Sequence, residues 1–362
     1  MSPEISILLP VYNGAVFLEA AFESLFAQSF QDFEIIVCDD GSKDESAAII
    51  ERMKGRDARV KSFANQKNVG LFANYNCCLK QACGQYIKPF AQDDTLAVHC
   101  LESMLDVLKK DQSVSLVTCA RNIIDAEGNV VETKRIFAES CLIKGSDVIL
   151  YNLISLTNWI GEPATAMFRK EHAGTGFDTS FFHLGDAEMW FQLLLKGNYY
   201  FIDEVLATFR RHDHNATKNN LAGLLFALDA LAIGKKYRHI LDDFGESEEH
   251  YLLRVAEFAA MQVDHLVRNE GLTAEKAVQA AVKGADINLD DGGERARRVM
   301  QSMVELNFIS LRALTNTITS LSDVTCRLQS EREYLNKKIE NINNSTSWKL
   351  TAPLRKLIGG QA

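Results

Sequence analysis

Two acidic clusters stand directly after apolar segments of the chain, at Asp39–Ser42 and at Gln92–Asp94. Adjacent carboxylates repel one another, and a divalent cation that also binds diphosphate oxygens removes that repulsion. If the apolar segments are strands of one parallel sheet, their carboxyl ends meet at the edge where α/β proteins bind ligands. The two clusters therefore predict one shared site for a metal-bound nucleotide.

The segments before the clusters have the character of buried strands. Glu34–Cys38 is short and rich in β-branched residues, and Tyr86–Phe90 is similar, although Pro89 restricts its pairing. A third run, Ile5–Leu9, ends at the turn residues Pro10–Gly14. Helical apolar spacing alternates with these strands, at Phe17–Leu25 and Ala47–Met53 after the first two strands along the chain and at Ala73–Ala82 before Tyr86–Phe90. This alternation predicts βαβ units and a mostly parallel sheet.

The composition is that of an ordinary globular protein. Of the 362 residues, 47% are hydrophobic and 24% are charged, and the length suits a catalytic domain with one further module. The net charge of −9 argues against a general nucleic-acid binder, because such proteins neutralise phosphates with a basic surface. Nucleic acid is therefore not an expected partner.

No segment has the pattern of a targeting peptide or a membrane span. Met1–Glu4 lacks the charge pattern of a signal peptide, and Ile5–Leu9 is too short for its apolar core. No window reaches the ~20 apolar residues that span a bilayer, since Asp229 interrupts Leu221–Ile233. The eight cysteines lack metal-binding spacing, so we expect them to be reduced and mostly buried. The protein is expected to be cytosolic.

Five short motifs follow one another in the first hundred residues: Ile7–Asn13, Val37–Ser42, Asn68–Gly70 with Asn74, Gly84–Ile87, and Asp93–Asp94. In order and spacing they resemble family 2 of the inverting nucleotide-sugar glycosyltransferases. Each motif alone is a weak signal, whereas the five together are specific. The resemblance implies the GT-A fold for residues 1–216, a Rossmann-like α/β sheet with flanking helices.

A second block extends the resemblance to the acceptor side of that family. Gly185–Trp190 is similar to its acidic motif, and Phe209–His212 to the Tyr-Arg-x-His element that follows. The usual Glu-Asp pair is Gly185–Asp186 here, which leaves Asp186 as the general base for the acceptor hydroxyl. The alternative is that Asp186 caps the helix that starts near Ala187.

The resemblance also implies the residues that bind the donor. They are Pro10, Tyr12, Asn13, Asp39, Asp40, Asn68, Gly70, Asp93 and Arg210. Asp40 is the candidate to accept the imide N–H that uracil, thymine and guanine present, which indicates a UDP-, dTDP- or GDP-sugar. Asp39 could instead cap the helix after Gly41.

The metal-binding candidates are Asp94 and His212, and the expected cation is Mn²⁺ or Mg²⁺. Gln92 replaces the first Asp of the commoner family motif, and Asp93 is expected to face the donor ribose or sugar. The alternative is a solvated turn in which Asp94 or Thr95 caps the next helix. His212 could equally be a surface residue.

The remainder of the chain has a different pattern. Residues 217–300 predict a helical appendage, with helices at Leu221–Lys235, Glu249–Arg268 and Thr273–Val282. Residues 301–345 carry a heptad repeat that predicts a coiled coil and self-association, or a long helix packed on its own domain. The tail, 346–362, is basic and amphipathic and resembles the ending of bacterial surface-polysaccharide glycosyltransferases. It suits an anionic membrane surface or docking to another polysaccharide-assembly protein.

Two further segments have structural or acceptor-side interpretations. Asp125–Asn129 reads as a hairpin turn. Trp159 and Gly161–Thr165 lie where the family places acceptor-side loop residues. Trp159 could stack on a sugar ring, although burial is the preferred interpretation.

These patterns predict a cytoplasmic enzyme, peripheral on the inner face of the cell membrane. It would transfer one sugar to a growing glycan or lipid-linked glycan. One rival is an inactive glycosyltransferase-like scaffold that acts through its coiled coil. A second is a nucleotidyltransferase, but that class carries a Gly-rich basic loop after its first strand, which Pro10–Gly14 lacks.

Overall fold

The computed structural model describes residues 2–212 and 224–270, with several positions between 329 and 338. The helix predicted at Thr273–Val282 and the basic tail lie outside the described residues, and the coiled coil lies almost wholly outside them. The predictions of self-association and of a membrane or protein contact for the tail therefore remain predictions. Within the described part of the chain, no helix is long and apolar enough to cross a bilayer.

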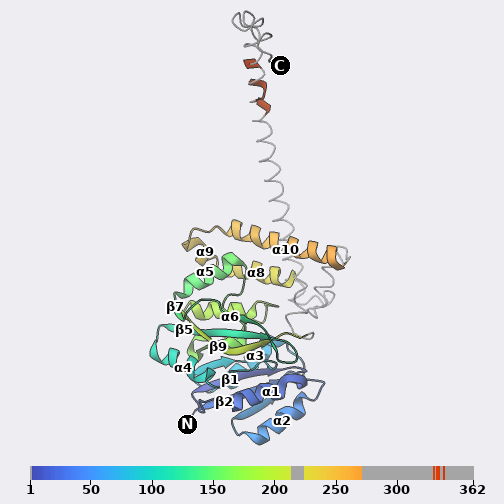
Figure 1. The fold of residues 1–362 in the computed structure, drawn as a ribbon, viewed down its shortest axis with the longest axis vertical. Coiled ribbons are helices and arrows are strands. Elements are labelled where there is room, and N and C mark those ends of the chain that lie inside the picture. The colour runs from blue at the N-terminus through green and yellow to red at the C-terminus, as the bar shows by residue number, and fades with distance from the viewer. Residues whose placement is uncertain (1, 213–223, 271–328, 331, 335–336, 339–362) are drawn as a thin grey trace, which may run out of the picture. The chain divides into compact units, whose positions relative to one another are not determined.

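The core of the fold is one nine-stranded sheet in the order β3-β2-β1-β4-β8-β5-β9-β7, with β6 paired to β5 (Figure 1). Its strands are β1 (Ile5–Val11), β2 (Phe33–Asp39), β3 (Val60–Ala64), β4 (Tyr86–Pro89), β5 (Val114–Ile124), β6 (Val130–Lys134), β7 (Cys141–Ile143), β8 (Met167–Arg169) and β9 (Asn198–Arg210). The three strands predicted from the sequence are β1, β2 and β4. The predicted hairpin turn also forms, and Asn129 N–H donates to Asp125 Oδ1 at 2.8 Å.

The sheet is mixed but mostly parallel, as expected: β1, β2, β3, β4, β5 and β9 run in one direction, and β6, β7 and β8 run opposite to them. The pairs β1–β2, β1–β4, β2–β3 and β5–β9 are parallel. The pairs β4–β8, β5–β8, β5–β6 and β7–β9 are antiparallel. The sequence did not reveal β8 because a three-residue strand shows no periodicity. Since β8 runs opposite to β4 and β5, the loop before β8 lies at the edge where β1, β2, β4, β5 and β9 end.

Helices cover both faces of this sheet. On one face the core joins strand residues to α1 (Ala15–Phe26), α2 (Ser46–Arg56) and α4 (Cys100–Lys110). On the other face α3 (Leu71–Gln81) contacts β1 and β2, and α6 (Gly185–Leu194) contacts β5. The helices predicted after the first strands thus form where expected, because their apolar residues recur at helical spacing.

The helices that follow β9 add a further layer. They are α8 (Leu224–Lys236), α9 (Arg238–Asp243) and α10 (Glu248–Glu270). In Figure 1 they stack beyond α5 (Gly145–Ser155) and α6, and contacts join α5 to α8 and α9. Two of the helices predicted for residues 217–300 are therefore present, as α8 and α10.

Candidate active site

Hydrogen bonds tie together the loops that follow β1 and β2. Asn13, with a left-handed φ of 49°, donates its N–H to Ser42 Oγ at 2.9 Å and accepts from Lys43 N–H at 2.7 Å. Asp39 Oδ1 accepts the N–H and the hydroxyl of Ser42 at 3.1 and 2.5 Å. The N-cap of α2 is Glu45, so Asp39 closes a local turn and does not cap that helix.

Asp40 organises a third loop. Its carboxylate, 2% exposed, accepts N–H groups from Val69 and Gly70, both at 2.9 Å, and from the Asn65 amide at 2.8 Å. These bonds hold the loop that carries Asn68, which is exposed. Asp39 is the more exposed carboxylate of the pair, so it is better placed than Asp40 to meet a nucleobase.

Gln92 joins the loop after β4 to the loop after β1. Its side chain accepts Tyr12 N–H at 2.9 Å and donates to Tyr12 O at 3.0 Å. A carboxylate could not donate the second bond, which explains physically why an amide stands at this position. A Cβ on Gly14 would lie 2.3 Å from Gln92 Oε1, so this contact needs glycine. Pro10 is buried within β1, whereas Tyr12 is 43% exposed.

The second acidic cluster meets the end of β9. Asp94 Oδ1 accepts Arg210 N–H at 2.8 Å, and Asp93 Oδ2 lies 3.0 Å from His212 Nε2. Asp94 is only 2% exposed, and burial together with the charge of Asp93 raises its pKa well above the ordinary value. Helix α4 begins at Cys100 with His99 as its N-cap, so Asp94 does not cap it. The tertiary fold thus brings Asp93, Asp94 and His212 together.

Arg210 anchors the framework around this cluster. Its Nε donates to Asp93 O at 2.8 Å, and Nη1 donates to the carbonyls of Asp125 and Ala126 at 3.0 and 3.1 Å. The guanidinium also lies 4.7 Å from the centroid of the Phe17 ring, which in turn contacts His212. Arg210 is 6% exposed, and these contacts give it a positioning role. Its contact with the donor stays a prediction.

The predicted base, Asp186, is the second residue of α6. Oδ1 accepts Ala187 N–H at 2.7 Å, and Asn158 Nδ2 lies 3.5 Å from Oδ2. Leu184 is the N-cap, so Asp186 does not cap α6. Its side chain is partly accessible to solvent, but many protein atoms surround the carboxyl and shield it from water. Burial first, and then the negative charge of Glu162, raise its pKa to about 7.

The glycine before Asp186 has a steric cause. A Cβ on Gly185 would lie 2.4 Å from the Phe72 ring of α3, so no larger residue fits without movement of that ring. The space that a glutamate side chain at position 185 would need is thus occupied by the Phe72 ring.

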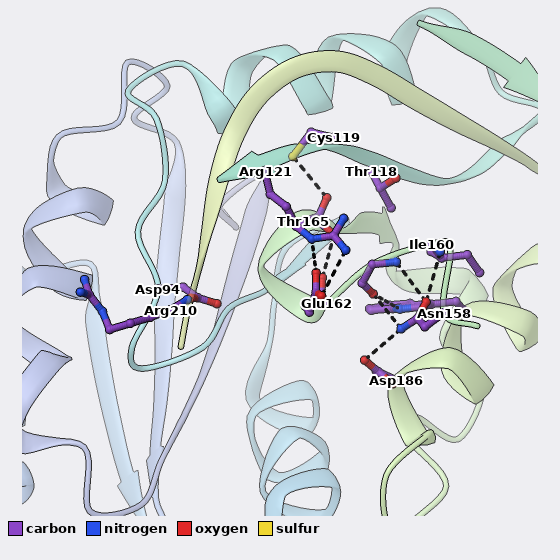
Figure 2. Close-up of polar contacts among 12 residues, drawn as sticks. Asp94, Thr118, Cys119, Arg121, Asn158, Ile160, Glu162, Thr165, Asp186 and Arg210 are labelled. Atoms are coloured by element: carbon purple, nitrogen blue, oxygen red, sulfur yellow. Dashed lines mark hydrogen bonds and ion pairs between the residues drawn. The ribbon is translucent and has the colours of Figure 1, made fainter. Parts of the chain in front are cut away.

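Glu162 belongs to the loop Gly161–Thr165 that the sequence placed on the acceptor side, but its charge was not among the predicted site residues. It precedes β8 and forms an ion pair with Arg121 of β5, whose side chain is buried, with Arg121 Nη2 3.1 Å from Oε1 (Figure 2). The charge of Glu162 contributes to the raised pKa of both Asp94 and Asp186, so it lies near both. Its electrostatic role could not be predicted from strand ends, because it comes before an antiparallel strand and not after a parallel one.

Tyr75 shows that the carboxylates predicted from distant segments share one region. This tyrosine of α3 is 1% exposed, and its hydroxyl donates to Phe90 O at 3.1 Å. Burial raises its pKa well above the usual range, and the charges of Asp94, Asp93 and Asp186 add to the effect. All three carboxylates are therefore close enough to act on the same buried hydroxyl.

Trp159 is half-buried, between the two outcomes considered from the sequence. Its Nε1 donates to Ser155 Oγ at 2.7 Å, and its ring lies 5.2 Å from that of Tyr151, which is 53% exposed. The neighbouring Asn158 side chain accepts the N–H groups of Ile160 and Gly161 and thereby shapes the loop beside Asp186.

Asp94, Asp93 and His212 are the candidate ligands for a hard divalent cation. Asp94 carries an energetic cost for its charge that a cation would offset, and Asp93 and His212 stand beside it. Among the described residues no three His, Cys, Asp or Glu side chains are grouped closely enough to hold a metal. The protein alone would therefore supply an incomplete coordination sphere there, and the remaining ligands would come from a bound anion or water.

Comparison with known proteins gives consistent results. The profile described as "Glycosyl transferase family 2" matches residues 6–177. A protein of Mycobacterium tuberculosis is 31% identical over 222 residues, which cover 58% of this chain and 67% of that protein. The GalNAc(5)-diNAcBac-PP-undecaprenol β-1,3-glucosyltransferase of Campylobacter jejuni is 28% identical over 199 residues, 55% of this chain and 62% of the relative.

Two solved structures resemble the fold. The S. aureus protein TarS, in complex with UDP-GlcNAc, has a TM-score of 0.56 at 17% identity, covering 84% of this chain and 89% of that one. The mannosyltransferase PcManGT of Pyrobaculum calidifontis, in complex with GDP-Man and Mn²⁺, has a TM-score of 0.54 at 15% identity, covering 84% and 87%. At this level of identity the likeness concerns the fold.

Proposed function

The chain belongs to glycosyltransferase family 2, and on this premise we propose that it moves a sugar from a nucleoside diphosphate sugar to a hydroxyl of a glycan, with inversion. One observation carries the proposal. Asp93 and Asp94, from the loop after β4, and Asp186, from α6, each add negative charge that raises the pKa of the buried Tyr75 hydroxyl. A donor-side cluster and a base are thus within reach of one substrate.

The proposed donor is a UDP-, dTDP- or GDP-sugar. The imide N–H of uracil, thymine or guanine needs an acceptor, and the partly exposed carboxylate of Asp39 supplies one at the end of β2. The complexes of TarS with UDP-GlcNAc and of PcManGT with GDP-Man support two members of this set, UDP and GDP. Tyr12, Asn13, Asn68 and Gly70 belong to the loops that would surround the nucleoside.

The proposed metal site consists of Asp94 with His212. A bound Mn²⁺ or Mg²⁺ would supply positive charge for the diphosphate that leaves the sugar. Asp93 is held by His212 and would face the donor ribose or sugar. The Mn²⁺ complex of PcManGT supports a divalent metal.

Asp186 is the proposed base. The acceptor oxygen attacks the anomeric carbon while the bond to the diphosphate oxygen breaks, and Asp186 takes the hydroxyl proton. A base works best when its pKa lies near the operating pH, and burial and Glu162 raise the pKa of Asp186 to about 7. The acceptor is proposed to be a glycan or a lipid-linked glycan, as the name of the Campylobacter relative supports.

The test begins with donor binding. Thermal-shift measurements with UDP-GlcNAc, GDP-mannose and related donors, each with and without Mn²⁺ or Mg²⁺, should reveal a donor that raises Tm only with metal. Donor turnover should then fall in Asp186→Asn and Asp94→Ala but not in Asp106→Asn, which removes an exposed carboxylate of α4. An inactive scaffold would show neither metal-dependent donor binding nor turnover that these variants change.

A further inference from the structure

Asp229 of α8 is a buried carboxylate in an apolar helix face. It is 0% exposed, and its Oδ2 accepts the N–H groups of three consecutive residues, Phe182, His183 and Leu184, at 2.8, 2.6 and 2.9 Å. Such charge-assisted bonds to successive N–H groups are strong and directional. The three residues lead directly into α6, and Asp186 is the second residue of that helix.

The main body of α6 is attached to α8 by other contacts. Glu188 is fully buried, forms an ion pair with Lys236 at 2.6 Å, and accepts from the Tyr237 hydroxyl at 2.9 Å. The ring of Tyr237 also packs edge-on against Phe191 at 5.2 Å. These contacts of Glu188 and Phe191 with Lys236 and Tyr237 therefore hold the body of α6 in place. Asp229 acts on a different part, the chain that enters the first turn.

A buried ionised carboxylate is costly to keep. Taking it out of water costs several kcal/mol, which its hydrogen bonds offset only in part, and an apolar residue at the same place would avoid the cost. What the carboxylate provides is a fixed backbone, because three hydrogen bonds to one oxygen define the path of residues 182–184. A base displaced by about 1 Å from its productive position can lose about 100-fold in rate.

We infer that Asp229 is a positioning residue for Asp186, so that the helices after β9 complete the active site instead of forming a separate appendage. This inference rests on the proposed role of Asp186 as the base. Two consequences follow: loss of Asp229 should loosen the entry to α6, and it should slow the chemical step without weakening donor binding.

A third consequence concerns pH. The charged groups that face Asp186 are Glu162, from the loop before β8, and Asp229, from α8, and both raise its pKa. Asn158 contacts it as a neutral amide. Removing the charge of Asp229 therefore shifts the acidic limb of the rate profile to lower pH.

The experiment compares Asp229→Asn and Asp229→Ala with Lys236→Met in the full chain. The asparagine keeps the shape of the side chain and one acceptor oxygen, whereas Lys236→Met breaks the ion pair to Glu188 but leaves residues 182–184 held. Hydrogen exchange of the segment 182–187, turnover of UDP-GlcNAc and GDP-mannose with Mn²⁺, and UDP affinity are measured for each. Circular dichroism at the assay temperature verifies that each variant is folded.

In Asp229→Ala we expect kcat to fall by at least about tenfold, UDP affinity to stay within about twofold, and exchange at 182–187 to accelerate. Asp229→Asn should show the same changes to a smaller degree, with the acidic limb at lower pH. Lys236→Met should lower Tm without these effects. If the Asp229 variants lose no more kcat than Lys236→Met, the inference is overturned.

The proposed function and this inference can fail separately. A wild-type protein that turns over none of the donors would contradict the proposed function. The hydrogen-exchange data would still test the structural role of Asp229. Unchanged exchange at 182–187 in Asp229→Ala would show that the carboxylate does not hold the segment that enters α6.

Discussion

The donor side and the base side of the site are built differently. On the donor side, Asp39 is the last residue of the parallel strand β2, and Asp94 lies in the loop after β4. Asp39 bonds to the nearby Ser42, and Asp94 accepts the Arg210 N–H at the end of β9. On the base side, Asp186 has one short bond, to the neighbouring N–H of Ala187. Its surroundings come from a loop before an antiparallel strand and from a helix added after the sheet.

This difference suggests a division of labour. In the proposed function, the carboxylates after the parallel strands bind a metal-bound diphosphate. The proposed base, Asp186, is surrounded by remote elements that bury it and bring two negative charges near it, and burial and these charges raise its pKa. If the comparison is right, substitutions on the two sides should have separable effects on binding and on chemistry.

The largest effect is expected from Asp186→Asn. Without a base, kcat should fall by about 10³-fold, while the affinity for the donor stays within a few-fold. Steady-state kinetics and calorimetric donor binding measure the two quantities. An equal loss of binding and rate would erase the distinction between the two sides.

Asp94→Ala should produce the opposite pattern. We expect the metal-dependent rise of Tm with donor to disappear and kcat/KM to fall by about 10²-fold, because a ligand that stabilises charge on the diphosphate is lost. Asp106→Asn, on the exposed face of α4, is the matched control and should behave as wild type. Retention of the metal-dependent shift in Asp94→Ala would remove Asp94 from the metal site.

Asp186→Asn should also raise stability, in a pH-dependent manner. The folded pKa of about 7 lies above the value of 3.8 for a free aspartate, so the charged form is disfavoured in the folded state. The resulting loss of stability is absent below about pH 4, grows up to about pH 7 and is complete above it. After allowance for partial exposure we expect a gain of about 1–3 kcal/mol at pH 8. Equal denaturation midpoints at pH 8 for the variant and wild type would contradict this.

The pH profile of the wild type tests the base side directly. Since Asp186 must be deprotonated to accept the proton, kcat/KM should fall about tenfold per pH unit below a pKa of about 7. Donor affinity measured over the same range separates the base from the metal ligands. A profile with its acidic limb near pH 4 would show that the base is not desolvated.

Glu162→Gln should give the smallest of these effects. The amide can still accept from Arg121, but the negative charge near Asp186 is lost, so the acidic limb should move to lower pH by less than about one unit. Donor affinity should change little. A limb that does not move would place Glu162 outside the electrostatic environment of the base.

The first half of the site could be predicted because it is local. The segments that end at Asp39 and Phe90 have strand composition, and the carboxyl ends of parallel strands must share an edge. Asp39, Asp93 and Asp94 are therefore placed by secondary structure alone. The Gln92 amide was noted as a departure from the family pattern, but its two bonds to Tyr12 depend on the pairing of β1 with β4.

The other half required the tertiary structure. Glu162 reaches the site because β8 is inserted antiparallel between β4 and β5. A strand of three residues is too short to be predicted from sequence periodicity. Asp229 was visible only as an interruption of an apolar helix. Its inferred positioning role rests on hydrogen bonds to residues 182–184, which are 45 to 47 positions away in the chain.

The amino-acid sequence by itself determined the α/β architecture at the N-terminal end, the place of Asp39, Asp93 and Asp94 at or after strand ends, and the family, because hydrophobic periodicity and motif spacing are local properties. Tertiary structure alone decided the mixed sheet, the Arg121–Glu162 pair and the link between α8 and the proposed base. The physical reason is that burial and Coulomb interactions depend on distance in space, and distance along the chain does not specify it.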